Sequence, residues 1–482
     1  MNMGHKWGHN SKMHKKPKKE GWFAGRTYRH FDHPLNFKSA QKAVTPKSVK
    51  NHAFRPLISY EMSVRRFKGF NKDGSSNVSH KDRLICKAAH KDSQIFAWYA
   101  HELENKYATL RKELGIDDCV LAYRSGKGCN IHMANKAFEE VKRRNACSVI
   151  AIDISGFFDN IDHKKLKEKW CQVIGNDSLP EDHYKVFKAI TRFSRVDQQQ
   201  CLQALGLEGR DLKKSTKRLC SDKEFHQKIC KRNQEEKSLV MLNADGKNED
   251  GSINWRSYGI PQGTPISAVL SNIFMIDFDL KMTAFANEIG GTYWRYSDDI
   301  LVICPQNLEE RAEQYVTELL QAQGKKLKIN NTKTEVSRFE ITGNNKFICS
   351  VRNKDGKWQK GRMQYLGFYF DGVRKMLRHQ TIARYQRKMK YAVRNARRTA
   401  LKFKKDKIRS KGLYRDLTDI GNRSMPAYAK RAGKAMSDEN ITKQLNSHRK
   451  KLTAYIEEQN QILKIQNAKK KKIVWKKNHL EK

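Results

Sequence analysis

The sequence predicts an α+β fold in which short antiparallel strands in the middle of the chain are flanked by helices. The strand signal is clearest at residues 292–304, where the apolar segments TYWRY and ILVIC lie on either side of Asp298 and Asp299. This pattern is typical of a β-hairpin whose tip carries the acids. The helix signal is clearest at 384–405, where apolar residues recur every three or four positions in a basic segment.

The elements before this hairpin are predicted from the same two periodicities. Residues 95–114 have large apolar side chains at helical spacing. Residues 119–124 (CVLAYR) and 147–153 (CSVIAID) are expected to be strands, with a helix at 131–145 between them. The segment 196–254 changes character, with QQQ, Lys/Glu-rich turns and the loop NADGKNEDGSIN, and we interpret it as an insertion in the main body.

The elements after the hairpin become increasingly basic. Two short strands are expected in the region 325–370, joined by a turn near Asn353, Asp355 and Gly356. From residue 374 the pattern is helical, and residues 361–482 contain 34 Lys and Arg against 9 Asp and Glu. The inward-facing stripe predicted for 384–405 consists of Tyr385, Met389, Val393 and Ala396.

The charge balance of the chain indicates a nucleic-acid partner. Lys and Arg number 97 against 51 Asp and Glu, a formal net charge of +46. A chain this basic has few plausible partners other than nucleic acid or an anionic membrane. We do not expect a membrane partner, because no run of about 18 consecutive apolar residues occurs. The basic, polar residues 1–20, expected to be a flexible tail, also lack the apolar core of a signal peptide.

The ten cysteines do not predict a metal site. They are scattered, and no C-x2-C pair occurs in the sequence, so a four-cysteine zinc site has no support. Without a signal peptide, the thiols are expected to be reduced in a cytoplasmic protein.

Acidic residues at two strand ends form the candidate reactive site. Asp298 and Asp299 are adjacent in the hairpin, and Asp153 ends the apolar strand SVIAID. Burying neighbouring carboxylates is costly unless a cation compensates, and Mg²⁺ prefers oxygen ligands. Three such acids could hold two metal ions roughly 4 Å apart, with Mn²⁺ as an alternative. A lone Asp–Asp pair is more often an ordinary turn, and Asp159 and Asp162 are expected to be a helix cap and a solvated face.

Five motifs between about residues 83 and 370 occur in the order found in one polymerase family: AIDISGFFDNID, GIPQGTPISAVLSNIFM, YSDD, NNTKTEV and YLGFYFDG. On these motifs the chain resembles the reverse transcriptases, in particular the bacterial retron, group II intron-like and defence-associated enzymes, and most of all the last group. The resemblance implies a right-hand polymerase fold with fingers, a palm of antiparallel sheet plus helices, and a basic helical thumb. It implies a tail at 1–20, an N-terminal extension and fingers at 21–145, a palm at 146–373 with the insertion at about 196–254, and a thumb with a C-terminal tail at 374–482.

The same resemblance implies the catalytic and metal-binding residues. Asp153, Asp298 and Asp299 match the family's catalytic carboxylates, which would bind two Mg²⁺ ions together with the backbone carbonyl of Ile154. Lys333, in NNTKTEV, matches the lysine that would protonate the leaving pyrophosphate.

Four further residues match substrate-binding positions of the family. Arg124 and Lys127 would contact the triphosphate, although Lys127 also fits a solvated basic turn. Phe158 would stack under the sugar and exclude a 2′-hydroxyl, and its alternative is ordinary core packing of a Phe–Phe pair. Gln262 would hydrogen-bond near the incoming sugar or the template base.

The resemblance implies RNA-templated DNA synthesis from dNTPs, with an RNA template and a DNA product as partners and a role in bacterial antiviral defence that uses a non-coding RNA. The chain departs from many retron and intron enzymes at Ser297, where they have alanine, and in the length added by residues 196–254. An RNA-binding scaffold on a polymerase fold and an RNA-dependent RNA polymerase are the alternatives, and Phe158 argues against the second. An oligomer or a partner protein is left open.

Overall fold

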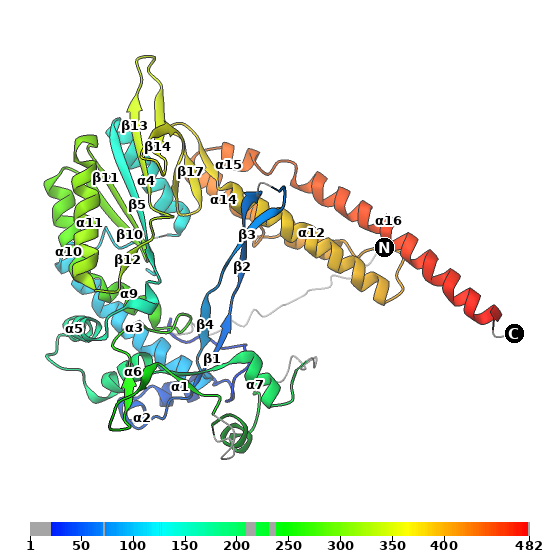
Figure 1. The fold of residues 1–482 in the computed structure, drawn as a ribbon, viewed down its shortest axis with the longest axis horizontal. Coiled ribbons are helices and arrows are strands. Elements are labelled where there is room, and N and C mark those ends of the chain that lie inside the picture. The colour runs from blue at the N-terminus through cyan, green and yellow to red at the C-terminus, as the bar shows by residue number, and fades with distance from the viewer. Residues whose placement is uncertain are drawn as a thin grey trace, which may run out of the picture. The chain divides into compact units, whose positions relative to one another are not determined.

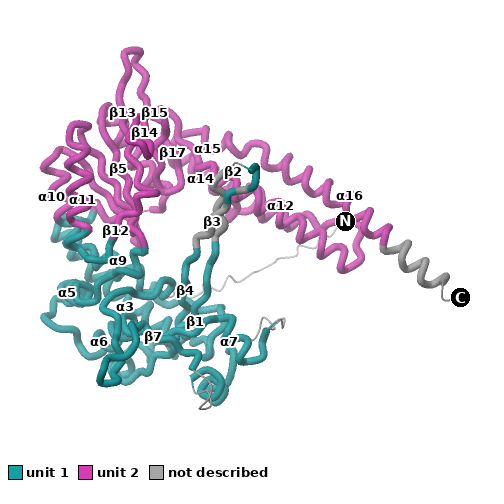
Figure 2. The backbone as a smooth tube through the Cα atoms, in the orientation of Figure 1, with its two compact units in different colours: residues 1–117, 156–280, 321–327 teal, residues 118–155, 281–320, 328–482 magenta. Residues whose placement is uncertain are grey.

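The computed structural model describes residues 21–480 with the exception of 71–72, 125, 127, 209–217 and 231–237. The predicted tail at 1–20 and Lys127 therefore lie outside the described residues. The chain divides into two compact units, each assembled from separate stretches of sequence (Figure 2). Unit 1 comprises residues 1–117, 156–280 and 321–327, and unit 2 comprises residues 118–155, 281–320 and 328–482.

The helical part of unit 1 is organised around the long helix α3 (His90–Glu113), which confirms the helix predicted at 95–114. The helix buries Ile95, Tyr99 and Leu103 along one face and packs against α5 (His163–Ile174) and α9 (Ser267–Phe274). Shorter helices complete this part: α1 (Phe37–Ala43), α2 (Pro46–Lys50) and α6 (Glu181–Thr191).

Unit 1 also contains a four-stranded sheet in the order β4-β1-β6-β7. Strand β1 (Leu57–Glu61) is antiparallel to β4 (Leu84–Lys87) and parallel to β6 (Ser194–Asp197), which pairs with β7 (Met241–Leu242). The segment predicted as an insertion is therefore joined to unit 1 through backbone hydrogen bonds at its beginning. Its other elements are α7 (Gln198–Ala204), α8 (Asp222–Phe225), the π-turn at His226–Cys230, and strands β8 (Ala244–Lys247) and β9 (Ile253–Trp255).

A separate hairpin leaves this sheet. Strands β2 (Val64–Phe70) and β3 (Ser76–Lys81) pair with each other and with no other strand among the described residues, and Figure 1 shows them as an extended arm.

Unit 2 is built on a seven-stranded antiparallel sheet with the order β10-β11-β5-β13-β14-β15, in which β12 also pairs with β5. The central strand β5 is almost wholly buried, which explains why its sequence is a continuous apolar run rather than an alternating one. Both the strand predicted at 147–153 and the hairpin around Asp298 are confirmed. The strands are β5 (Cys147–Ser155), β10 (Thr292–Tyr296), β11 (Asp299–Cys304), β12 (Lys328–Ile329), β13 (Glu335–Ile341), β14 (Phe347–Arg352) and β15 (Trp358–Lys360).

Helices pack on this sheet through apolar faces that the sequence shows. Helix α4 (Asn130–Arg144) confirms the helix predicted at 131–145 and contacts β5. Its Phe138 ring also stacks on Phe370, which lies outside this sheet, at a centroid distance of 5.1 Å. Helix α11 (Glu309–Gln323) buries Ala312, Val316 and Leu320. Helix α10 (Ile276–Glu288) begins in unit 1 and ends in unit 2.

The strand predicted at 119–124 is wrong. Only Val120 forms a β-bridge, to Arg295, and the chain then turns at Ala122 and Tyr123. Cys119, Val120 and Leu121 are buried by packing instead. An apolar run of this length reports burial but does not by itself require a ladder of hydrogen bonds.

The C-terminal part of unit 2 is a small sheet followed by helices. The turn predicted near Asn353 is confirmed, because the backbone N–H of Asn353 donates to the carbonyl of Lys357 between β14 and β15. Strands β16 (Met363–Tyr365), β17 (Phe368–Phe370) and β18 (Lys375–Leu377) form the three-stranded sheet. The helices are α12 (His379–Lys402), α13 (Lys411–Leu417), α14 (Met425–Met436), α15 (Asn440–Lys443) and α16 (His448–Leu480).

The long helices α12 and α16 lie side by side (Figure 1). The inward stripe predicted for α12 is confirmed at Tyr385, Met389 and Val393, which are buried, while Ala396 is half-buried. Within the described part of the chain, no helix combines the length and the apolar character needed to cross a membrane. All ten cysteines are free thiols.

Candidate active site

The pairing of two strands brings the predicted carboxylates of unit 2 together. Strand β11 runs antiparallel to β5, and the register places Asp299 directly opposite Asp153. Directly opposed residues in an antiparallel pair have their side chains on the same face of the sheet. Asp298 lies at the tip of the β10–β11 hairpin, where its backbone carbonyl accepts a hydrogen bond of 3.1 Å from the N–H of Ile154.

Burial and like charge act together on this cluster. The pKa of the Asp299 carboxyl is raised to about 7, first by burial and then by the negative charges of Asp298 and Asp153. The cations Lys333 and Arg378 oppose this shift without cancelling it. The cluster thus carries more negative charge than its protein surroundings neutralise.

Two residues of the NNTKTEV motif hold Asp153. The ammonium of Lys333 forms an ion pair and hydrogen bond with the Asp153 carboxylate. The side-chain amide of Asn330 donates to the same carboxylate at 3.2 Å, and its backbone N–H donates to the Asp153 carbonyl at 2.8 Å. Asn330 was not among the predicted site residues, although its place in the motif was a usable signal.

The hairpin tip is held in an uncommon backbone conformation. Ser297 has a φ of +61° and is only 3% exposed. The fully buried guanidinium of Arg295 donates to the Ser297 carbonyl at 3.1 Å, and the Ser297 hydroxyl donates to Tyr123 at 3.3 Å. Left-handed conformations of non-glycine residues are costly, so these contacts fix the tip that carries Asp298 and Asp299. Neither contact was predicted from sequence, because each depends on how the chain folds around the hairpin tip.

The donor set fits a hard divalent cation in its chemistry. Asp153, Asp298 and Asp299 offer only oxygen ligands and excess negative charge, which Mg²⁺ favours. However, no group of three or more His, Cys, Asp or Glu side chains within the described residues is already arranged to hold a metal ion. The cation that contacts Asp153 is instead Lys333.

The predicted nucleotide-contacting residues Phe158 and Gln262 belong to unit 1, where backbone hydrogen bonds join their segments. The N–H of Ile260 donates to the Phe158 carbonyl at 2.9 Å. Gly259 has a φ of +90°, and a Cβ at this position would lie 2.9 Å from the Asp159 carbonyl oxygen. Glycine is therefore required for this close approach.

The two predicted nucleotide-contacting side chains, Phe158 and Gln262, are more exposed than the neighbouring core residue Phe157. Phe158 is half-buried, whereas its neighbour Phe157 is 3% exposed and packs near Phe274. The core-packing alternative thus describes Phe157 better than Phe158. The Gln262 side chain is also half-buried, and its backbone carbonyl accepts from the N–H of Cys86 at 2.8 Å.

The sequence analysis also singled out Arg124, Asp159 and Asp162, and the structure describes all three. The Arg124 guanidinium in unit 2 donates to the carbonyl of Val120 at 2.8 Å, so the side chain folds back along its own turn. Asp162 caps α5 by accepting from the N–H of Lys165 at 2.9 Å, and Asp159 is exposed. A helix cap and a solvated face are both present, but the cap is Asp162 and the solvated position is Asp159, the reverse of the expected order.

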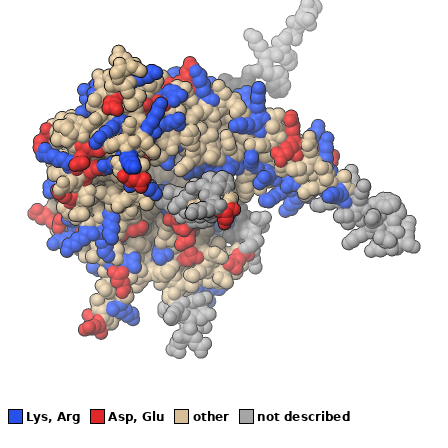
Figure 3. Space-filling model, turned by 45° about the horizontal axis from the view of Figure 1, so that its top comes forward, with Lys and Arg blue, Asp and Glu red and all other residues tan. Residues whose placement is uncertain are grey.

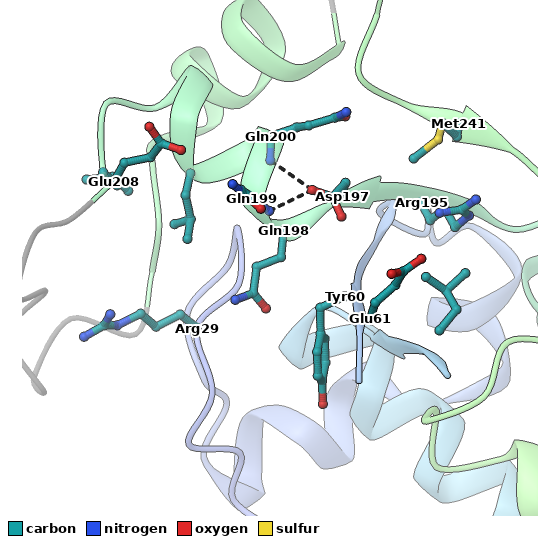
Figure 4. Close-up of a pocket in the computed structure, with 13 residues that line it drawn as sticks. Arg29, Tyr60, Glu61, Arg195, Asp197, Gln198, Gln199, Gln200, Glu208 and Met241 are labelled. Carbon is teal, nitrogen blue, oxygen red and sulfur yellow. Dashed lines mark hydrogen bonds between the residues drawn. The ribbon is translucent and has the colours of Figure 1, made fainter. Parts of the chain in front are cut away.

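A hollow of about 880 Å³ in unit 1 is lined partly by the segment 196–254, and sequence reasoning did not anticipate it (Figure 4). Its charges are mixed, because Arg29 and Arg195 are set among three acids. One of the acids, Asp197, caps α7 by accepting from the backbone N–H groups of Gln199 and Gln200. This mixture does not select one class of ligand, and we assign the hollow no function.

Comparison with known proteins finds one family model that resembles part of the chain. Residues 189–370 match the family model described as reverse transcriptase (RNA-dependent DNA polymerase). This segment of the chain is therefore similar to the reverse-transcriptase domain. The matched segment includes Gln262, Asp298, Asp299 and Lys333, and it begins after Asp153. No curated protein matches the sequence.

Among solved structures, the chain is similar to yeast telomerases at low identity. The truncated apo telomerase of Candida tropicalis is 12% identical with a TM-score of 0.38, covering 67% of this chain and 57% of that one. The telomerase of Candida albicans, in complex with a fragment of telomeric RNA, is 12% identical with a TM-score of 0.35, covering 87% of this chain and 60% of that one. The chain spans little more than half of these proteins, and TM-scores this low do not establish a shared activity.

The raised pKa of Asp299 predicts a pH-dependent gain in stability when its charge is removed. The folded state holds this proton more tightly than the unfolded chain, so ionised Asp299 destabilises the fold as pH rises from about 4 through 7. With metal ions chelated, Asp299→Asn should raise the free energy of unfolding by on the order of 1–3 kcal/mol at pH 8. The gain should shrink as pH falls toward 4.

Thermal or denaturant unfolding at pH 8 and pH 5.5 measures this effect. Asp355→Asn, at an exposed aspartate in the β14–β15 turn of the same unit, is the matched control and should change little. An equal effect of Asp299→Asn at both pH values would contradict the assignment of the shift to this carboxyl.

Proposed function

We propose that the protein is a reverse transcriptase that adds dNTPs to a DNA strand on an RNA template by two-metal-ion nucleotidyl transfer. The observation that carries the proposal is the β5–β11 register, which sets Asp153 opposite Asp299 with Asp298 adjacent in the chain. The family match over residues 189–370 supports the same chemistry. The proposed metal ligands are the carboxylates of Asp153, Asp298 and Asp299 and the carbonyl of Ile154, and the ions are Mg²⁺ or Mn²⁺.

The ions, when bound, would lower the pKa of the primer 3′-hydroxyl and neutralise the leaving pyrophosphate. The chain itself supplies fixed positions for the acids, because Arg295 and Ser297 hold the hairpin tip and Asn330 holds Asp153. Lys333 is proposed to donate the proton that the leaving pyrophosphate takes up. Since this ammonium contacts Asp153, it must leave that carboxylate before it can donate its proton to the product.

The nucleotide-binding roles are proposed from the motifs. Arg124 and Lys127 would contact the triphosphate, where Arg offers bidentate bonds and Lys a point charge. Gln262 would bond near the sugar or the template base. Phe158 would form the wall against a 2′-hydroxyl, and its half-buried ring leaves part of its surface free for such a contact.

The thumb is proposed to bind the nucleic-acid backbone through one face of α12. Opposite the buried stripe, the exposed residues on this helix are mostly basic, with the 64% exposed ring of Tyr391 at the centre. No ion pair within the described residues involves the basic members of this stripe. On the face shown in Figure 3, Lys and Arg predominate along the extension that α12 and α16 form. The basic stripe consists of Arg384, Arg387, Lys388, Arg394 and Arg398.

The finer assignment is proposed from the motif resemblance alone. It places residues 21–145 in the fingers, 146–373 in the palm and 374–482 in the thumb and tail. It also places the protein among bacterial defence-associated reverse transcriptases that copy a non-coding RNA. Sequencing the nucleic acid that co-purifies with the parent protein and with an inactive variant tests this assignment.

Removing one carboxylate should abolish synthesis without unfolding the protein. Asp153→Asn and Asp298→Asn should each lower dNTP incorporation on a primed RNA template by at least a hundredfold, because each is a proposed metal ligand. RNA binding and the melting temperature should change little for Asp298→Asn, while Asp153→Asn also loses the Lys333 ion pair. Single-nucleotide extension measures incorporation, with Asp355→Asn as the control, and full activity of either variant would refute the carboxylate assignment.

Shortening Phe158 should relax the choice of sugar. Phe158→Val removes the proposed steric wall, so the ratio of ribonucleotide to deoxyribonucleotide incorporation should rise by tenfold or more. Matched dNTP and rNTP extension measures this ratio. Phe157→Leu, at the buried neighbour, should leave the ratio unchanged. If an active Phe158→Val variant keeps the parent ratio, Phe158 is an ordinary packing residue.

Reversing charge on the α12 stripe should weaken nucleic-acid binding in a salt-dependent way. The triple change Arg384→Glu, Arg387→Glu and Lys388→Glu should reduce the slope of log affinity against log salt by about 2 to 3, since each lost phosphate contact contributes roughly 0.7 to 0.9. Deleting residues 467–482, most of whose side chains lie outside the described residues, should reduce it less.

The control for the stripe reverses three exposed cations elsewhere in unit 2, Lys411, Arg423 and Lys430. Affinity for a template–primer duplex is measured from low to moderate salt. Equal slopes for the parent and the stripe variant would show that this face of α12 contacts a protein or nothing at all.

A further inference from the structure

Unit 2 contains a second hollow, whose lining includes none of the proposed catalytic residues. Its volume is about 1060 Å³, and it is lined by the β13–β14 turn and β14, the β15–β16 connection, β17 with the turn that follows it, and the first residue of α12. Phe347 in its wall pairs with Ile341, eight residues beyond Lys333 along the β13 segment. At about 3.3 Å per residue, the β13–β14 turn end of the hollow lies roughly 25 Å along the strand from Lys333. The opposite end, at His379, follows Arg378 in the chain, whose charge acts on Asp299.

Two glycines bring the walls of this hollow together. The N–H of Gly361 donates to the Cys349 carbonyl at 2.9 Å, and a Cβ at Gly361 would overlap with the side chain of Val351. Gly372 has a φ of +97°, and a Cβ there would lie 2.7 Å from the Phe347 carbonyl oxygen. The small sheet and the β14 edge are therefore in direct backbone contact, which gives the hollow a fixed floor.

The charges in this hollow are mostly positive. Four Lys and Arg side chains and His379 line it, against the single acid Asp371. Asp371 is already engaged, because it accepts from the backbone N–H groups of Val373 and Arg374 and from the Arg374 guanidinium at 3.0 Å. Among the described residues, the other three cations have no acidic partner: Lys346, Lys360 and Arg362.

Aromatic side chains lie beside these cations. Tyr369 and Phe347 are half-buried in the wall, and the Tyr369 ring lies 5.6 Å from that of His379. The Arg362 guanidinium donates to Nε2 of His379 at 3.2 Å, so one end of the guanidinium is oriented by this contact. Unpaired cations next to partly exposed rings are the combination that binds phosphates and stacks unpaired bases.

We propose that this hollow, which we call the distal basic pocket, binds the sugar–phosphate backbone of an unpaired RNA segment that is not at the catalytic carboxylates. Its volume is at the upper end of the range for small-ligand pockets, which leaves room for more than one nucleotide. The hollow in unit 1 has no comparable excess of positive charge. The proposal shares with the proposed function only the choice of nucleic acid as partner, and it requires no polymerase activity.

Charge reversal with a matched control tests the pocket. Lys346→Glu with Lys360→Glu reverses two exposed cations inside it, and Lys354→Glu with Lys357→Glu reverses two exposed cations of the same β-hairpin region outside it. The probe is a labelled twelve-nucleotide oligouridylate, with single-stranded DNA of the same length and an acidic peptide as further arms. The pocket variant should lose about 1.4 from the salt slope for the single-stranded RNA, at roughly 0.7 per phosphate, and the control less than half of that.

A second measurement locates the contact directly. Photocrosslinking of 4-thiouridine RNA, followed by peptide mapping, should label peptides containing Phe347 or Tyr369, and Tyr369→Ala should reduce this labelling severalfold. Equal slope losses in the two charge variants, crosslinks confined to other regions, or binding of the acidic peptide in place of RNA would each overturn the proposal. Tighter binding of the single-stranded DNA than of the RNA would also overturn it.

The outcome is separable from that of the proposed function. Extension of a short pre-annealed primer–template at saturating concentration should be unchanged in the pocket variant, because the pocket does not touch the proposed catalytic residues. A parent protein that binds and crosslinks RNA at the pocket but extends no primer would refute the polymerase proposal alone. A parent that extends primers and shows no crosslink at the pocket would refute the pocket alone.

Discussion

The arrangement of unit 2 depends on holding three acidic side chains near one another at the end of a buried sheet. Asp153 and Asp299 are opposed across β5 and β11, and the raised pKa of Asp299 records the free-energy cost of this pairing. The surrounding structure meets that cost with rigid support: Lys333 and Asn330 on Asp153, and Arg295 on the hairpin tip. A fold that only needed stability would place apolar or oppositely charged residues at this register.

Local patterns predicted several elements, because a strand buried on both faces is a continuous apolar run and a helix with one buried face has a helical period. The apolar run of β5 and the buried stripe of α12 are examples, and both elements were found where expected. Residues 119–124 have a similar composition but form only one bridge, because their burial comes from packing around Arg295 rather than from a ladder. Composition reports burial, and it does not report which backbone groups pair.

Contacts between residues distant in sequence were beyond prediction from the chain alone. Motif resemblance singled out Asp153, Asp298 and Asp299 as candidates, yet the direct opposition of Asp153 and Asp299 follows only from the register. Likewise, the hydrogen bond from Ser297 to Tyr123 joins residues 174 positions apart. The distal basic pocket is the extreme case, since its lining comes from four short stretches, of which only the one with Tyr369 and Asp371 overlaps a motif. Its charge becomes visible only when Asp371 is seen to be engaged locally.

The net charge of +46 is distributed in a way that relates these features to one another. Acids form ion pairs where they stabilise the fold, as Glu309 does with Arg338 and Asp371 with Arg374. Among the described residues, the cations of the α12 stripe form no ion pair, and neither do Lys346, Lys360 and Arg362 of the distal basic pocket. Unpaired like charges repel, so both basic surfaces destabilise the protein alone and become favourable against a polyanion. The acidic cluster has the opposite requirement, because its excess negative charge is relieved by cations. A nucleic acid that arrived with divalent ions would satisfy both requirements, so the charge distribution is consistent with the proposed function.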